Sequence, residues 1–300
     1  MRIDFMKINL TAIDRLSLLF LALLTVVIVF NIALMPSWPI LFFKYALIAS
    51  ALVCFAVVRG RMSSGSAAHY IHAGLAFAAV LVIFNSLGDI IPALRLHYYD
   101  DLLIKIDYLL FGIHPTVWME RFNSALLTAV LQIAYISYYF IPIALAIVLL
   151  RRSRYLEFET AVFAVLLCFY LSYIGYFFIP AVGPRFTLNL LQTSELRADP
   201  VTLWIQQILN SLEYNKADAF PSGHTAVSLV VLYYAWKFRQ RRLGLILAPV
   251  VAALIISTVY LRYHYVIDII TGILLAVLTV SIAPPAERLF AGRRCRLTRD

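Results

Sequence analysis

The chain has 300 residues, of which 63% are hydrophobic and 14% are charged, and its mean hydropathy is +0.87. Soluble domains carry about 25% charged residues, so this composition excludes an ordinary soluble fold and indicates a protein whose solvent is lipid. The net charge of +9 would suit a nucleic-acid partner, but its distribution along the chain argues against one.

Eight apolar stretches are candidates for helices that cross a bilayer. They are Leu16–Leu34, Ile40–Val58, Ala73–Ile91, Ala125–Leu150, Thr160–Ile179, His224–Trp236, Leu243–Tyr260 and Tyr265–Ile282. The sixth is short unless its flanks belong to it. The first exceeds the roughly 7–15 apolar residues of a cleavable signal peptide, so we interpret it as a retained anchor. We therefore predict an all-α, polytopic transmembrane bundle of about eight spans, with residues 1–300 forming one membrane domain.

Charged residues separate onto two sides of the predicted bundle. The N-terminus, the loops Arg59–His72, Arg151–Glu159 and Lys237–Arg242, and the C-terminal tail hold 17 Lys or Arg and 6 Asp or Glu. The opposite side holds 8 Lys or Arg and 10 Asp or Glu. Because Lys- and Arg-rich loops stay in the cytoplasm, we predict that both termini are cytoplasmic. We expect no nucleic-acid partner, and we expect a location in a plasma membrane such as the bacterial inner membrane.

Two longer loops lie on the predicted outer side, and each contains a candidate helix. In Pro92–Ser124, acidic residues from Asp100 onward alternate with leucine and isoleucine at the spacing of a short amphipathic helix. In Ala181–Ser222, the candidate is Val201–Leu212, with Asp199-Pro200 as its start. We expect both helices to lie in the membrane interface.

Polar residues gather beside the outer ends of the later spans. His264 and Asp268 are four residues apart, which places them on one face if the segment is helical. A carboxylate there can fix the imidazole tautomer and leave the other ring nitrogen as a nucleophile. The alternative is a structural pair at a helix end, and the spacing alone does not decide between the two.

A second polar group begins the sixth apolar stretch, at Pro221-Ser222-Gly223-His224. Proline starts helices well, and the backbone N–H groups of Ser222 and Gly223 at a helix start favour an anion. His224 could donate a proton to a leaving group, although an N-cap serine beside an interfacial histidine would look the same. Arg185 and Arg262 supply guanidinium groups that match phosphate oxygens, or each extends to the interface. Together these residues predict a phosphoryl-transfer site.

The same segments resemble the three signature motifs of the type 2 phosphatidic acid phosphatase superfamily, which includes vanadium haloperoxidases. Gly183-Pro184-Arg185 resembles the first motif, Ala219–Ala226 the second, and Ser257–Asp268 the third, within about Phe178–Gly272. The resemblance implies an integral membrane enzyme that acts without metal on a lipid phosphate or phospholipid.

The resemblance also implies roles for individual residues. His264 would be the nucleophile that forms a phosphohistidine, Asp268 would orient it, and His224 would protonate the leaving group. Ser222 and Gly223, together with Arg185, would hold the phosphate oxygens.

The chain departs from the family pattern at two positions. The family's lysine seven residues before the first-motif arginine is Phe178 here, and its third-motif arginine is Thr258. Arg262, four residues further on, is expected to supply the missing charge. The Gly-Pro-Arg and Tyr-Leu-Arg-Tyr-His-Tyr patterns, with the stretch Asp101–Phe122, resemble the branch containing inositol phosphorylceramide synthases. Members of that branch transfer a phospho-headgroup to an alcohol, so the acceptor stays open between water and an alcohol.

A different class of protein, an anionic-lipid transporter or binding protein, would also place arginines at such a surface. Transporters often contain inverted repeats with broken helices, and no repeat is visible here. Because metal-ligand motifs such as His-Glu-x-x-His are absent from the sequence, we expect no metal and no cofactor. The remaining histidines lack ligand spacing and are expected at the surface or interface: His69, His72, His97 and His114.

Overall fold

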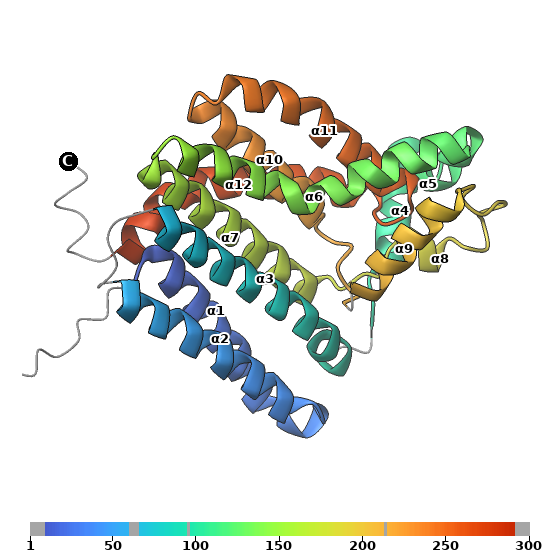
Figure 1. Cartoon of the computed structure of the whole chain (residues 1–300). Helices are drawn as coiled ribbons and strands as arrows, with labels where there is room; N and C mark the ends of the chain where they lie inside the picture. The colour runs from blue at the N-terminus through green and yellow to red at the C-terminus, as the bar shows by residue number, and fades with distance from the viewer. Residues whose placement is uncertain (1–9, 60–65, 95–96, 213–214, 292–300) are drawn as a thin grey trace, which may run out of the picture.

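The computed structural model describes residues 10–59, 66–94, 97–212 and 215–291 (Figure 1), and all regular secondary structure within these ranges is helical, which confirms the all-α prediction. The long helices are α1 (Ala12–Phe30), α2 (Trp38–Arg59), α3 (Ser66–Leu94), α6 (Ala125–Arg151), α7 (Tyr155–Phe178), α10 (Gly223–Lys237), α11 (Arg241–Tyr260) and α12 (Val266–Ala291). The shorter ones are η1 (Ile32–Leu34), α4 (Asp100–Phe111), α5 (Pro115–Trp118), η2 (Met119–Phe122), α8 (Pro184–Thr187) and α9 (Pro200–Leu212). The predicted basic C-terminal tail lies outside the described residues.

Seven of the described helices are long and apolar enough to cross a membrane: α1, α2, α3, α6, α7, α11 and α12. A bent pair, α4 with α5 and η2, raises the number to eight if it counts as one span, and its two halves meet at 64°. The predicted sixth span is α10, whose 15 residues extend over about 22 Å. This length is less than the roughly 30 Å of a hydrocarbon core, but α10 packs against α6, α7, α11 and α12. Protein therefore surrounds the short helix.

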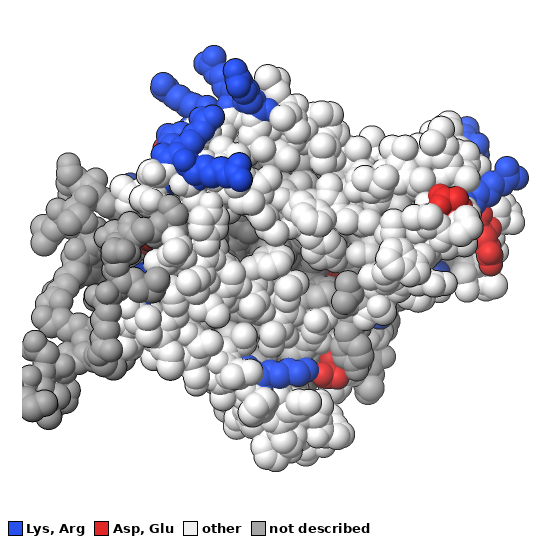
Figure 2. Space-filling view, in the orientation of Figure 1, with Lys and Arg blue, Asp and Glu red and all other residues white. Residues whose placement is uncertain are grey.

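The described charges gather at the two ends of the bundle. Figure 2 shows Lys and Arg side chains at the end that carries the α10–α11 turn, with mixed acidic and basic side chains at the end that carries α5 and α8. Few charges lie between these ends, as a bilayer requires. This separation agrees with the charge count from the sequence, and the cytoplasmic assignment of the basic end stays a prediction.

Both short helices expected in the outer loops are present, as α4 and α9. Asp199 caps α9, because its carboxylate accepts hydrogen bonds from the N–H groups of Val201 and Thr202 at 2.9 and 3.1 Å and from the Thr202 hydroxyl. These hydrogen bonds, the Thr202 hydroxyl above all, lower the pKa of Asp199. The exposed side chains of α9 include Val201 and Trp204, so its apolar face points away from the bundle, in keeping with an interfacial helix.

One expectation about the histidines is wrong. His72 was expected at the surface, but it is 2% exposed and its Nε2 lies 2.7 Å from Oδ1 of Asp14, which is also buried. The two side chains belong to α3 and α1, at the end of the bundle opposite α4 and α9. Polar groups inside a membrane protein face the protein interior and pair with one another, and His72 is buried in this way against Asp14 of α1.

Candidate active site

The second motif starts α10 and is held against the start of α12. Ser222 is the N-cap of α10, and its Oγ accepts a hydrogen bond from Thr225 N at 3.3 Å. The Ser222 N–H donates to the Asp268 carbonyl at 3.0 Å. A Cβ added at Gly272 would lie 2.7 Å from the Ser222 carbonyl oxygen, so only glycine permits this approach of α12. The backbone therefore brings the second and third motifs together before any side chain contributes.

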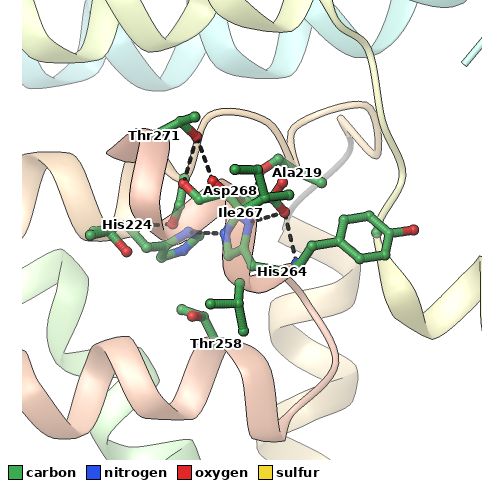
Figure 3. A network of polar contacts seen from close by, with 12 residues as sticks. Ala219, His224, Thr258, His264, Ile267, Asp268 and Thr271 are labelled. Carbon is green, nitrogen blue, oxygen red and sulfur yellow. Dashed lines mark hydrogen bonds and ion pairs between the residues drawn. The ribbon is translucent and has the colours of Figure 1, made fainter. Parts of the chain in front are cut away.

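The two motif histidines lie side by side (Figure 3). Nδ1 of His224 is 3.3 Å from Nε2 of His264, and Nδ1 of His264 is 2.8 Å from the Ala219 carbonyl oxygen. A carbonyl oxygen only accepts hydrogen bonds, so His264 carries its proton on Nδ1. Nε2 of His264 then holds a lone pair and accepts from the Nδ1–H of His224. The geometry thus creates a nucleophilic nitrogen and a proton donor in direct contact.

Asp268 lies beside His264, but the two residues do not share one face of a helix as expected. The helix α12 begins at Val266, so His264 precedes it, and the 3.4 Å between His264 Nδ1 and Asp268 Oδ2 spans the helix start. Asp268 Oδ2 also accepts from Tyr265 N at 2.8 Å. Asp268 is fully buried. The carboxylate thus holds the backbone at Tyr265 as well as facing the ring of His264, while the Ala219 carbonyl makes the shorter contact with that ring.

The first motif reaches the same place from the loop after α7. Gly183 has a φ of +90°, and a Cβ there would lie 2.5 Å from the Tyr263 carbonyl oxygen, so the loop needs glycine. The Arg185 N–H donates to the Arg262 carbonyl at 3.0 Å. The guanidinium of Arg185 lies 4.8 Å from the centre of the Tyr263 ring and donates to Asn210 Oδ1 of α9 at 2.8 Å. Arg185 is therefore next to the third motif, with a neutral amide oxygen at its tip.

Arg262 holds the outer loops together. Its guanidinium donates to Glu120 Oε1 at 2.9 Å, to the Ser194 carbonyl at 2.7 Å and to Gln192 Oε1 at 2.8 Å. Burial lowers the pKa of Arg262, and the Glu120 carboxylate acts in the opposite direction. These contacts occupy the group that was expected to bind phosphate, so this arrangement gives that expectation no support. The helix α11, which contains Thr258, ends at Tyr260. The chain then turns sharply, with a φ of +65° at Arg262, so Arg262 does not lie one helical turn beyond Thr258.

We expect Arg262→Gln and Glu120→Gln to lower thermal stability in detergent by similar amounts, about 1–3 kcal/mol each, because each change leaves the charge of a largely buried partner without its counter-charge. The double variant should lose less than the sum of the two, since both single changes break one interaction. Thermal unfolding of the four proteins measures this coupling. Additive losses, or unchanged stability with at least about tenfold weaker inhibition by inorganic phosphate, would instead favour Arg262 as a phosphate ligand.

Aromatic rings enclose His224. The ring centres of Tyr135 and Tyr138 on α6 lie 4.7 and 4.3 Å from that of His224, and Tyr135 also stacks on Tyr263 at 4.5 Å. Gln132 lies three residues before Tyr135, on the same face of α6. Gln132 is 1% exposed. These rings limit the orientations that the imidazole of His224 can adopt.

A cavity of about 410 Å³ opens beside His224, between α3, α6 and α7. Its polar lining groups include Asn85, Tyr139 and Asp218, and the rest of the wall is mainly apolar, with Phe77, Phe84 and Phe169 among its residues. Nε2 of His224 is buried and has no hydrogen-bond partner among the described residues. A cavity of this size accepts part of a lipid molecule.

The helix α4 was recognised in the sequence, but the role of its carboxylates was missed. Asp100 accepts from the N–H groups of Val182 and Gly183, and Asp107 accepts from those of Val266 and Ile267. Both side chains are buried. Their spacing of seven residues, two turns of helix on one face, was the available signal.

The fold is that of a helical membrane protein, and the histidines of the second and third motifs meet at one end of its bundle. Residues 103–282 match the PAP2_3 family model of the PAP2 superfamily, and the chain belongs to this superfamily of membrane phosphatase-like proteins. A PA-phosphatase related-family protein of Dictyostelium discoideum is 25% identical over 177 residues, which are 51% of this chain and 31% of that protein. The match thus spans about a third of that relative. No solved structure matches the chain.

Proposed function

We propose that the protein is a metal-independent phosphoryl-transfer enzyme that acts on a lipid phosphate ester through a phosphohistidine at Nε2 of His264. The observation that carries this proposal is the contact of 3.3 Å between His224 Nδ1 and His264 Nε2, with the Ala219 carbonyl holding the proton of His264 on Nδ1. A histidine nucleophile beside a second proton-carrying histidine is the arrangement that acid–base-assisted covalent catalysis needs.

The proposed reaction has two steps. In the first, substrate binds with His224 protonated on both ring nitrogens; the lone pair on His264 Nε2 attacks phosphorus, the bond from phosphorus to the lipid oxygen breaks, and the Nδ1 proton of His224 passes to that oxygen, which leaves His224 neutral. In the second, water or an alcohol attacks phosphorus, the phosphorus–nitrogen bond breaks, and His224 takes the proton from the attacking oxygen. Asp268 faces Nδ1 of His264 at 3.4 Å and would stabilise the positive charge that develops on the ring.

Phosphate binding would use the start of α10 and Arg185. The positive end of the α10 dipole favours an anion, and Ser222 and Gly223 form that end. The Ser222 N–H already donates to the Asp268 carbonyl, so the Ser222 hydroxyl would be its group for phosphate. The guanidinium of Arg185 would exchange the neutral Asn210 oxygen, now 2.8 Å away, for a charged phosphate oxygen, because charge-assisted hydrogen bonds are stronger. The phosphoryl group would also break the hydrogen bond between the two histidines, because His264 Nε2 and His224 Nδ1 would both turn to the substrate.

A second candidate, transfer to an alcohol as in the inositol phosphorylceramide synthase branch, is favoured by the cavity beside His224. Its apolar wall suits lipid chains, and Tyr139, Asn85 and Asp218 can bind a hydroxyl group near the imidazole. Transfer to an alcohol requires that the bound hydroxyl meet the phosphohistidine before water does. The enclosed position of the cavity meets that requirement better than an open surface site would.

The test is an assay of purified protein with a phosphatidic acid and with a phosphatidyl-headgroup lipid, in EDTA. We expect phosphate release or headgroup transfer in EDTA, with loss of activity in His264→Ala. Addition of inositol, glycerol and a sugar alcohol then shows whether the product divides between free phosphate and a phosphodiester. Intact cells given a membrane-impermeant short-chain substrate test the predicted extracytoplasmic site. No turnover of any substrate, with retained binding of anionic lipid, would support the transporter or binding class.

A further inference from the structure

The helix α4 contains no residue of the three motifs, but its two buried carboxylates contact the loops that carry two of them. Asp100 and Asp107 are 4% and 2% exposed, while Leu109 on the same helix is 82% exposed. On α4, two carboxylates are thus buried against protein while apolar side chains such as Leu109 point outward together with the charged Asp101 and Lys105. A buried carboxylate is costly unless it accepts several hydrogen bonds. The N–H groups that donate to Asp100 and Asp107 are therefore needed to keep these two side chains buried.

Asp107 caps the start of α12, which begins at Val266, two residues after His264. Its Oδ2 accepts from Val266 N at 2.9 Å and its Oδ1 accepts from Ile267 N at 2.8 Å. The first N–H groups of a helix have no partner within the helix, and here a carboxylate from another helix bonds two of them. The Tyr265 N–H goes to Asp268. The backbone on the C-terminal side of His264 is thus held at three consecutive N–H groups by two carboxylates.

Asp100 holds the first-motif loop. Its carboxylate accepts from Val182 N at 3.0 Å, from Gly183 N at 2.9 Å and from the Tyr265 hydroxyl at 2.8 Å. Burial, and next the Asp100 carboxylate, raise the pKa of Tyr265 far above its usual range, so this hydroxyl stays a donor. Asp100 thereby connects the loop that ends in Arg185 to the residue after His264.

We propose that α4 positions the active site, with Asp107 setting the placement of the His264 nucleophile and Asp100 setting the placement of Arg185. This proposal rests on the proposed phosphohistidine function. Neither carboxylate contacts the reacting atoms. Both act through backbone N–H groups, and a displacement of about 1 Å in a nucleophile can cost on the order of 100-fold in rate.

Asp107→Asn tests the first half of the proposal. The amide keeps one acceptor oxygen but replaces the other with a donor that opposes an N–H group, so we expect the single-turnover rate of phosphohistidine formation to fall about 10- to 100-fold. KM should change less than about threefold, since the groups that bind phosphate are untouched. Asp107→Glu keeps both acceptors and should restore part of the rate. The matched control is Asp101→Asn, an exposed carboxylate on the same helix, which should leave the rate unchanged.

Asp100→Asn tests the second half. We expect it to weaken competitive inhibition by inorganic phosphate about tenfold, more than Asp107→Asn does, because it loosens the loop before Arg185. Equal profiles for the two variants, or an Asp107→Asn rate equal to that of Asp101→Asn, would overturn the proposal. If Asp107→Asn does not accumulate, Asp107→Glu decides: a wild-type rate, or a loss that follows thermal stability alone, would also overturn it. An inactive wild-type protein would instead contradict the proposed function itself.

Discussion

Replacing His264 by alanine is expected to abolish phosphoryl transfer and phosphohistidine formation together, with a rate loss of at least about 10³-fold. The proposed reaction forms its covalent bond at Nε2 of this residue, which faces His224 Nδ1 at 3.3 Å, so no other described group replaces it in that geometry. The measurement uses a substrate labelled with ³²P, quenched in base, because a phosphohistidine survives base and is lost in acid. The label should remain on the wild-type protein and be missing from the variant.

Two controls separate the loss of the nucleophile from a disturbed site. His264→Asn keeps an amide N–H near the position of Nδ1, so it can still donate to the Ala219 carbonyl, and it should be as inactive as His264→Ala while melting closer to wild type. His97→Ala changes an exposed outer histidine and should keep full activity. A labelled phosphohistidine in His264→Ala would contradict the assignment of the nucleophile and would favour His224 in that role.

The fold was predictable because length and apolar composition dictate transmembrane helices. The exception is α10, whose 15 residues are too few to pass a test of length. It packs against α6, α7, α11 and α12, and most of its side chains are buried. A helix packed against four others does not have to match the thickness of the lipid along its whole length, and no single stretch of sequence contains that information.

The catalytic segments were predictable as segments, and their exact geometry was not. The spacing of His264 and Asp268 indicated a pair on one helix face, but α12 starts between them. The contact at 3.4 Å therefore depends on how the loop enters α12. The hydrogen bond from His264 to the Ala219 carbonyl also escaped prediction, because a backbone oxygen has no residue type by which it can be recognised.

Charged residues near the site were the least predictable. The position of Arg262 in the third motif predicted a phosphate ligand, yet Glu120 and the Gln192–Ser194 segment bind its guanidinium. The amphipathic pattern predicted an interfacial helix with Asp107 on its polar face, yet the Asp107 carboxylate accepts hydrogen bonds from the start of α12. In both cases the pattern identifies a polar face, and only the packing of distant segments decides what that face contacts.

Replacing His224 by alanine is expected to slow the first step by an amount that depends on the leaving group, and to slow the second step for every substrate. For an alkyl phosphate ester the leaving oxygen needs a proton, so loss of the His224 Nδ1–H should slow phosphohistidine formation roughly 10²–10⁴-fold. For a nitrophenyl phosphate the leaving group is stable as an anion, and this step should slow much less. The second step still needs a base to take the proton from water or an alcohol, so the phosphohistidine should accumulate on the variant.

The measurement is a rapid-mixing assay with the nitrophenyl ester. His224→Ala should release about one nitrophenol per protein in a burst and then turn over slowly, while the wild type should show no comparable burst if its second step is fast. The packing control is Tyr138→Phe, which keeps the ring that lies 4.3 Å from the His224 ring and should retain the wild-type dependence on the leaving group. Equal slowing of alkyl and nitrophenyl esters, without a burst, would remove His224 from proton transfer and leave it a role in positioning His264.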